Sequence, residues 1–176
     1  MKNRGPARQV HPGLEDDTAE GAAMRRAMGE RIVAADASQF NSVGVQLGYY
    51  YDNSPININD GSPPPAFSLD RYVPTTRPGS RAPHVWLRDG TSLYDALGRH
   101  FTLLCIGKSP GSAGSIQDAA ESRKVPLKVL CLSEPEILKA YENFSYVLIR
   151  PDQHIAWRGH ELPKDSFALI DRIRGA

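Results

Sequence analysis

The stretch FTLLCIGKSPGSAG, residues 101–114, decides the fold because it leads from a buried strand through a loop into a helix. FTLLCIG is a short, continuous apolar run, which is typical of a strand covered on both faces. GKSPGSAG carries the glycines and the proline of a loop, and a helix is expected over residues 115–124. Such a strand, loop and helix form the first half of a crossover to a parallel strand.

The second half of the crossover follows directly. LKVLCL, residues 127–132, predicts another buried strand. Ser133 and Glu136 have the spacing of a capping box, so a second helix is expected over residues 134–142. Strands and helices therefore alternate in this part of the chain.

The C-terminal part predicts a hairpin and a closing helix. SYVLIR and HIAWRG, joined by PDQ, have the pattern of two strands around a short turn. Pro163 opens the last helix. Its apolar face carries Phe167, Ile170 and Ile173. The resulting order of strand, helix, strand, helix, strand, strand, helix predicts an α/β fold, a thioredoxin-like mixed four-stranded sheet with flanking helices.

The N-terminal part predicts a helix and then a strand. Apolar residues recur at helical spacing from Thr18 to about Phe40, which indicates one amphipathic helix. The apolar positions are Met24, Met28, Ile32 and Ala35. The next segment, VGVQLGYYYDNSPI, alternates like a strand with one buried face. The alternating positions are Val45, Leu47, Tyr49 and Tyr51.

Proline distinguishes the segment that joins these two parts. The prolines between residues 53 and 83 remove backbone donors and favour an extended course, as in a linker or a wrapping arm. After it, HVWL predicts a short strand and TSLYDALG a turn of helix. Four parts are therefore expected: a flexible lead-in over residues 1–17, a helix and strand over 18–60, a proline-rich linker over 61–83, and the thioredoxin-like domain over 84–176.

Composition and charge limit the classes of function. Hydrophobic residues make up 40% and charged residues 23% of the chain, values close to those of ordinary globular proteins. The formal charge is +1, so no overall field steers the chain to nucleic acid or to an anionic membrane. No apolar run is long enough to cross a bilayer, and the N-terminus lacks the apolar core of a secretory signal. A cytoplasmic protein with no nucleic-acid or membrane partner is expected.

No catalytic, cofactor-binding or metal-binding residue is predicted. Gly107, Gly111 and Gly114 lack the spacing of a P-loop and of a dinucleotide fingerprint. The loop that holds these glycines contains no cysteine, which nearly excludes a thioredoxin-type redox enzyme. Cys105 and Cys131 lie in apolar runs as expected for free, buried thiols, and they have neither CxxC nor zinc-ligand spacing. The five histidines are scattered and form no hydrolase motif.

Two groups of residues are candidates for an interface or a pocket. Arg81, His84 and Trp86 form the densest group of polar and aromatic residues. A histidine that hydrogen-bonds the backbone at a strand entrance fits this group better than a catalytic histidine. Tyr49 and Tyr51 fit packing or interface contacts better than a ligand cage, since tyrosine is favoured where one end is apolar and the other wet.

A resemblance to a known family rests on several of these segments. LGYYYDNSPI, the proline-rich arm, RYVPTTRPGSRAPHVWLRDGTSLYDALGRHFTLL and VLIRPDQHIAWRG resemble the C-terminal region of the FAD-dependent aromatic-ring hydroxylases, the flavoprotein monooxygenases related to phenol hydroxylase. The elements PG, R, APH, WL and DG occur in that order and spacing. The resemblance extends from about Ala22 to the last helix.

This resemblance implies where the chemistry is carried. In such hydroxylases an N-terminal dinucleotide-binding region holds FAD, and NAD(P)H reduces the flavin so that an aromatic ring can be hydroxylated. The C-terminal thioredoxin-like domain is not catalytic, and it serves packing, dimer contact or covering of the main body. Residues 18–60 would be the final helix and strand of that body.

The chain departs from the family pattern because the glycine-rich FAD fingerprint, the central DG element of the flavin-binding region and the later GD element are missing. The chain alone is therefore expected to bind no cofactor and to hydroxylate nothing. Its expected partner is the missing flavin-binding catalytic domain, or a second copy in a homodimer with residues 20–52 in the contact. The alternative is a stand-alone small-molecule or partner-binding module with a redox-inactive fold. Its pocket would be lined by Tyr49, Tyr51, His84 and Trp86.

Overall fold

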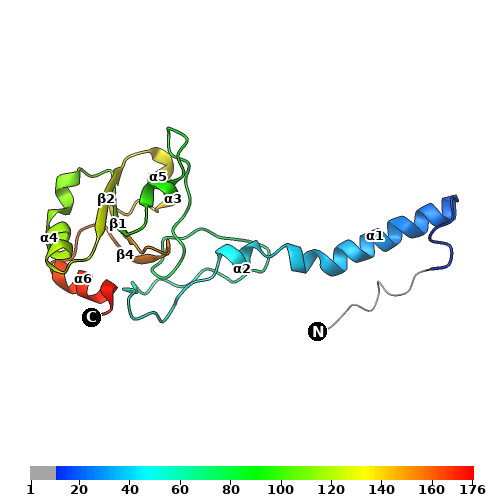
Figure 1. Ribbon diagram of the computed structural model, residues 1–176, viewed down its shortest axis with the longest axis horizontal. Helices are drawn as coiled ribbons and strands as arrows, with labels where there is room; N and C mark the ends of the chain where they lie inside the picture. The colour runs from blue at the N-terminus through cyan, green and yellow to red at the C-terminus, as the bar shows by residue number, and fades with distance from the viewer. Residues whose placement is uncertain (1–10) are drawn as a thin grey trace.

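The computed structural model describes residues 11–176, so the first ten residues of the expected lead-in lie outside the described part. Figure 1 shows a body that contains the C-terminus and a long helix, α1 (Ala19–Phe40), that projects away from it. Residues 11–17 fold as turns beside α1, where the guanidinium of Arg25 donates to the carbonyl oxygens of Leu14 and Asp16 at 2.8 and 3.0 Å.

The body is built around a four-stranded sheet with the order β2-β1-β3-β4. Its strands are β1 (Phe101–Ile106), β2 (Leu127–Leu132), β3 (Tyr146–Ile149) and β4 (Ile155–Gly159). β1 and β2 are parallel, whereas β3 runs antiparallel to both β1 and β4. This mixed sheet confirms the predicted thioredoxin-like fold.

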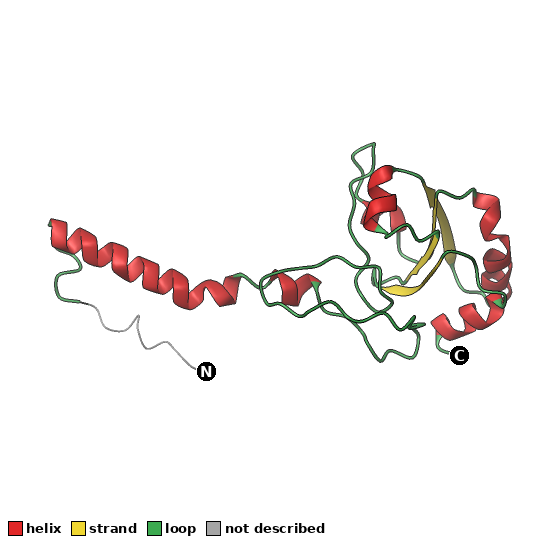
Figure 2. Cartoon of the chain, turned by 180° about the vertical axis from the view of Figure 1, so that it is seen from behind, coloured by secondary structure: helices red, strands yellow, loops and turns green. Residues whose placement is uncertain are grey.

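Helices cover both faces of the sheet (Figure 2). One face carries α4 (Gly114–Ser122), which follows the 3₁₀ turn η2 (Pro110–Ala113), and α6 (Ser166–Arg174). The other carries α3 (Leu93–Leu97) and α5 (Pro135–Ala140). Because side chains alternate along β1, Leu103 and Cys105 enter the first apolar cluster while Leu104 and Ile106 enter the second.

The outer edge of β4 is covered by the chain that precedes the body. The amide of Gly79 donates to the carbonyl of Ile155 at 2.7 Å, and the amide of Ile155 donates to the carbonyl of Ser80 at 2.9 Å. Further along the edge, the amide of Ile58 donates to the carbonyl of Ala156 at 2.8 Å. An open strand edge invites pairing with other chains, so this cover protects the sheet.

The predicted helix over residues 18–40 is confirmed as α1, with the hydroxyl of Thr18 accepting the amide of Gly21 at 3.1 Å. Its predicted apolar face is not buried, because the body lies beyond the C-terminal end of the helix (Figure 1). Ile32 and Ala35 are exposed. Helical spacing thus identified the helix but not what covers it.

The strand predicted after α1 is wrong. Helix α2 (Val43–Leu47) takes its first half, and the second half keeps one isolated bridge, between Tyr50 and Ser80. Gly44 is the physical reason, since its amide donates to the carbonyl of Leu69 at 3.0 Å and a side chain at this position would collide with neighbouring backbone carbonyls. The alternating apolar residues were therefore misleading.

Two further predictions fail at the start of elements. HVWL forms no strand and contributes one isolated bridge, between Trp86 and Ser92, because the chain turns back immediately. The capping box is also wrong: Ser133 lies outside α5, where its amide donates to the Glu134 carboxylate at 3.0 Å. Pro135 supplies the first residue of α5 and needs no capping partner for its nitrogen.

The last helix begins later than expected. Asp165 caps α6, its carboxylate accepting the amide of Ala168 at 2.9 Å, so Pro163 lies outside the helix. Phe167 is exposed, contrary to the prediction, and Leu169 lies beside the two predicted isoleucines on the buried face.

Tyr141 generates a prediction on stability. It is fully buried, and its hydroxyl donates to the carbonyl of Pro83 at 2.9 Å. Tyr141→Phe leaves that buried carbonyl without its donor, so the free energy of unfolding should fall by about 1 to 2 kcal/mol in urea titrations. Tyr146→Phe is the matched control, since none of the described hydrogen bonds uses its hydroxyl. Equal losses in both variants would contradict the role of the Tyr141 hydrogen bond.

Candidate functional site

A cluster of aromatic and basic side chains lies beside the covered edge of β4. We call it the aromatic edge. It consists of Tyr49, Tyr51, Arg81, His84, Trp86, Tyr94 and His154. The structure thus brings all five candidate residues from the sequence into one continuous cluster, together with Tyr94 and His154. Whether these five residues act as an interface or as a pocket stays a prediction.

The first half of the aromatic edge is centred on His154. The ring centroids of Tyr49 and Tyr51 lie 5.1 and 4.8 Å from that of His154, and the two tyrosine rings meet edge to face at 5.8 Å. The guanidinium of Arg150 lies 5.1 Å from the Tyr51 ring centroid. Aromatic and cation–π contacts of this kind fix the segment that carries the tyrosines against the sheet.

The second half of the aromatic edge is centred on Tyr94. The guanidinium of Arg81 lies 4.9 Å from the Tyr94 ring centroid, and its Nε donates to the Tyr94 hydroxyl at 3.1 Å. Arg81 also donates to the side-chain oxygen of Gln153 at 2.9 Å. The Tyr94 hydroxyl in turn donates to the carbonyl of Ala82 at 2.6 Å. These bonds hold the entering chain against α3.

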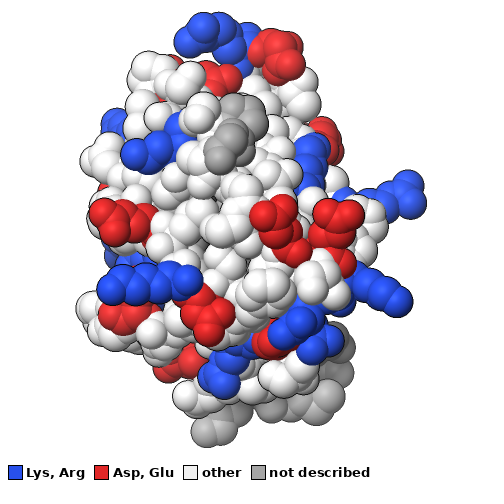
Figure 3. Space-filling model, turned by 90° about the vertical axis from the view of Figure 1, so that its left-hand side faces the viewer, with Lys and Arg blue, Asp and Glu red and all other residues white. Residues whose placement is uncertain are grey.

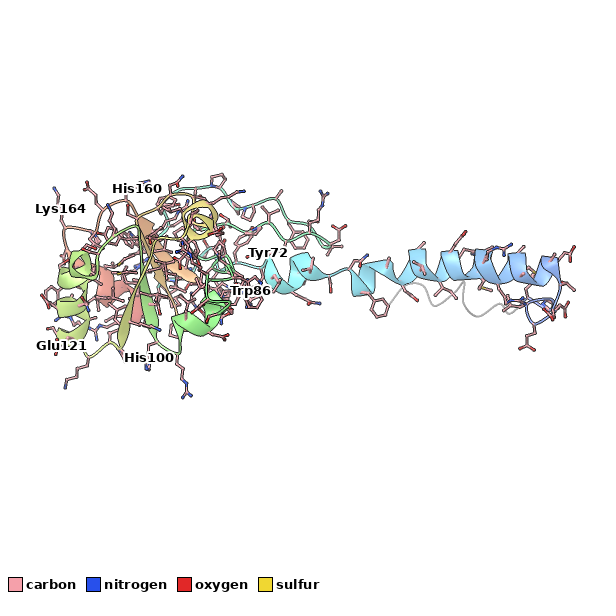
Figure 4. All side chains as sticks on the ribbon, turned by 90° about the horizontal axis from the view of Figure 1, so that it is seen from above. Tyr72, Trp86, His100, Glu121, His160 and Lys164 are labelled. Carbon is pink, nitrogen blue, oxygen red and sulfur yellow. The ribbon has the colours of Figure 1, made fainter. Side chains whose placement is uncertain are left out.

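His84 has a structural setting. Its Nε2 lies 2.9 Å from the hydroxyl of Ser92, which also accepts the amide of Tyr94 as the N-cap of α3. The partner is therefore a capping side chain and not the backbone group expected from the sequence. Trp86 meets the His84 ring edge to face at 4.9 Å and is 68% exposed. Figure 4 shows Trp86 and Tyr72 at the end of the body that faces α2.

His154 is the buried member of the aromatic edge, with only 1% of its side chain exposed. Its Nδ1 lies 3.0 Å from the carbonyl oxygen of Asp152 and must donate, because a carbonyl only accepts. Its Nε2 is then an acceptor, and none of the described residues donates to it. Burial lowers the pKa of His154, which outweighs the opposing effect of the Asp152 carbonyl. The imidazole is therefore neutral at pH 7.

Three arginines fasten residues 52–62 to the body, and we call them the arginine clamp. The pairs are Arg77 with Asp52, Arg150 with Asn57, and Arg158 with Asp60. Arg77 and Arg158 are nearly buried, with 3% and 7% of their side chains exposed. Buried guanidinium groups need such partners because an unpaired buried charge is costly.

A groove of about 870 Å³ lies between residues 52–59 and α6. Trp157 and Ile58 contribute apolar surface, and Asp52, Asp165 and Arg172 contribute charges. This volume is within the range of small-molecule sites. This groove could not be predicted from the sequence, since its walls come from residues 52–59 and from residues 157–172.

The loop at the end of β1 contains no cysteine. It carries serines where a working thioredoxin carries its cysteine pair, and Cys105 and Cys131 are free thiols inside the sheet. Across residues 11–176, no three His, Cys, Asp or Glu side chains gather closely enough to hold a metal ion. No helix in the same part of the chain combines the length and the apolar character needed to cross a membrane.

Sheet order and helix placement together define a thioredoxin-like domain. The family model for the C-terminal domain of aromatic-ring hydroxylases matches residues 75–175. The chain belongs to this family. The matched region begins before the expected boundary at residue 84, and it takes in Gly79 and Ser80, which pair with the edge of β4.

Comparisons with individual proteins agree. The FAD-dependent monooxygenase opdD of Penicillium oxalicum is 33% identical over 85% of this chain, and phenol 2-monooxygenase of a Pseudomonas species is 29% identical over 92%. The solved structure of RebC-10x, native and bound to K252c, matches with a TM-score of 0.78 and 38% identity over 96% of this chain. The chain spans 29% of each of the two monooxygenases and 32% of the RebC-10x chain.

Sequence reasoning missed His154, Tyr94 and the arginine clamp. His154 opens a predicted strand, but nothing local shows that Tyr49 and Tyr51 pack on it from a hundred residues away. Isolated arginines in a sequence look like solvated charges, and their burial is visible only when the arm is placed. The one available signal for Tyr94 was its position just after the N-cap of a predicted helix.

His154 generates a prediction on pH. Because burial lowers its pKa in the folded state, the unfolded chain takes up the proton first as pH falls below about 6.5. The free energy of unfolding should therefore be full well above that pH and decline as the pH falls through it. His154→Gln should flatten this decline in urea titrations, whereas His100→Gln, at an exposed position, should keep it. A decline of unchanged slope in His154→Gln would overturn the assignment.

Proposed function

We propose that this chain is the non-catalytic C-terminal accessory part of an FAD-dependent aromatic-ring hydroxylase. In this proposal, α1, α2 and the aromatic edge are covered by a flavin-binding body, and the thioredoxin-like domain stabilises that body mechanically. The named relatives, one of them an FAD-dependent monooxygenase, support the reaction class. This chain spans only 29% of each relative, which supports the proposal that FAD is bound by another part of the protein.

The observation that carries this proposal is the uneven distribution of exposed apolar side chains. With the exception of Phe167, the exposed large apolar residues of the described chain lie between Ile32 and Trp86. They include Phe40 at 80% exposure, Phe67 at 71% and Val33 at 69%. The opposite end of the molecule shows acidic and basic side chains side by side (Figure 3). Apolar surface concentrated in this way is typical of a contact with another protein part.

The partner that fits best is the flavin-binding body. The match to RebC-10x covers 96% of this chain, so it includes α1 as well as the thioredoxin-like domain. The longer RebC-10x chain, of which the match covers 32%, leaves a remainder large enough to cover such a helix. A homodimer through residues 20–52 would bury part of the same surface and remains the second option for the partner.

The residues present do not fit a flavin dinucleotide. A pyrophosphate cradle needs free backbone amides at the turn from a strand into a helix. In this chain η2 interrupts the turn from β1 to α4, and Pro110 removes one of the donors. We therefore derive no catalytic step for this chain alone.

A flavin test follows from this misfit. The purified chain, incubated with excess FAD and then dialysed, should show no flavin absorbance and should not oxidise NADPH. The measurement is a visible absorption spectrum before and after dialysis, with a flavoprotein monooxygenase treated in parallel. Retained flavin in stoichiometric amount would refute the accessory role.

A copurification test addresses the partner. The chain, coexpressed with the flavin-binding region of a monooxygenase of this family that lacks its own C-terminal part, should copurify with it. Phe40→Ser and Trp86→Ser remove apolar side chains from the proposed contact and should reduce the recovered complex several-fold. Phe167→Ser is the matched control, because Phe167 is exposed but lies outside that surface. Equal recovery for all variants would contradict the proposed contact.

A stand-alone binding module is the second candidate, favoured by the groove between residues 52–59 and α6. Such a module would bind a small molecule with Trp157 and Ile58 as apolar contacts. The copurification experiment separates the two candidates, since a module of this kind gains no partner from the flavin-binding region.

A further inference from the structure

The two cysteines of the chain are direct neighbours across the sheet. In the parallel register of β1 and β2, Cys105 is the partner of Cys131. Both side chains belong to the same apolar cluster, beneath α4, so they point to the same face. Burial and then the nearby Cys131 thiol raise the pKa of Cys105 to about 12. The thiols therefore interact, although their positions in the sequence are twenty-six residues apart.

The spacing of neighbouring strands permits a bond between these sulfurs, but under strain. Adjacent strands lie about 4.8 Å apart. This separation falls within the range of about 4.4 to 6.8 Å between the Cα atoms of a disulfide. The Cβ atoms of parallel neighbours are also about one strand spacing apart, whereas a disulfide prefers about 3.5 to 4.5 Å. A bridge here would draw the strands together and would be easily reduced.

The two thiols differ in their access to solvent. Cys105 is fully buried, whereas Cys131 lies on the edge strand β2 and is only partly buried. The loop after β1 closes over this end of β2, where the amide of Gly107 donates to the carbonyl of Leu132 at 2.8 Å. Lys108 and Ser109 in that loop are exposed. Opening of this short loop would let a small oxidant reach Cys131 first.

We propose that Cys105 and Cys131 form a reversible oxidation site for hydrogen peroxide. The Cys131 sulfur attacks one peroxide oxygen, the O–O bond breaks, and the products are a sulfenic acid and one water. The Cys105 thiol then attacks that sulfur, forming the S–S bond and releasing the second water. Two electrons pass from the two thiols to the peroxide. A thiol such as glutathione restores both cysteines by two exchange steps and is itself oxidised to its disulfide.

The fold places this site where a structural response is expected. Ala113 and Ile116, at the end of η2 and in the first turn of α4, pack in the same cluster as both cysteines. Drawing β2 toward β1 changes the space beneath these side chains. The start of α4 is therefore the element that should loosen when the bridge forms.

The test treats the purified full chain with hydrogen peroxide under native conditions. The expected product is a monomer that has lost the mass of two hydrogen atoms and has no free thiol, with a peptide map that joins the two cysteines. Glutathione in excess should return it to the starting mass. Amide exchange should increase at the start of α4 in the oxidised form, and the reduced chain is the reference.

Single variants make the result decisive. Cys131→Ser should resist mild peroxide, because the remaining thiol is buried and protonated. Cys105→Ser should accumulate the sulfenic acid on Cys131, which dimedone captures. Chains linked through intermolecular disulfides, sulfinic acid as the main product, or a bridge that glutathione leaves intact would each overturn the proposal. A disulfide that forms only in urea would also overturn the proposal, since the pairing of β1 and β2 in the folded chain would then not bring the two thiols together.

Discussion

The guanidinium of Arg158 is the contact on which the placement of the N-terminal half depends. It donates to the carboxylates of Asp60 and Glu142 at 2.7 and 3.1 Å and to the hydroxyl of Thr76 at 2.6 Å, and it lies 4.4 Å from the Phe144 ring centroid. Burial alone would raise the pKa of Asp60, but hydrogen bonds from Ser62 and Arg158 outweigh it and lower that pKa. The ion pair thus joins the proline-rich arm, the end of α5 and β4 in one network.

This network determines how the body and the projecting helix are related. Proline stiffens the arm but gives it no direction, because an extended chain without backbone donors has few contacts of its own. The arginine clamp supplies the direction by holding residues 52–62 beside β4. Tyr51 then packs on His154, and α2 and α1 extend away from the body on this side (Figure 1). The position of the arm on the body therefore determines where α2 and α1 begin.

The sequence was sufficient to place β1 and β2 nearly to the residue, because each is a short apolar run. The sequence overstated the burial of β2, an edge strand whose residues are partly buried apart from the exposed Lys128. It failed at α2, where the contact of Gly44 with the chain near Leu69 overrides an alternating pattern. It also missed His154 and the arginine clamp, because their partners lie far away in the chain. For the aromatic edge, the sequence predicted five of the residues but not His154, on which Tyr49 and Tyr51 pack.

The loop after β1 contributes little to the two apolar clusters. Among the side chains that the structure describes, the buried members of the two apolar clusters come mainly from the strands and from α3, α4, α5 and α6, and residues 107–113 contribute Ala113. The sheet itself, however, holds the Cys105 and Cys131 thiols in register, at a spacing where a disulfide between them would be strained. Thiol oxidation in such a domain would take place between two strands of the sheet and would change the packing under α4. It would not involve an exposed catalytic loop.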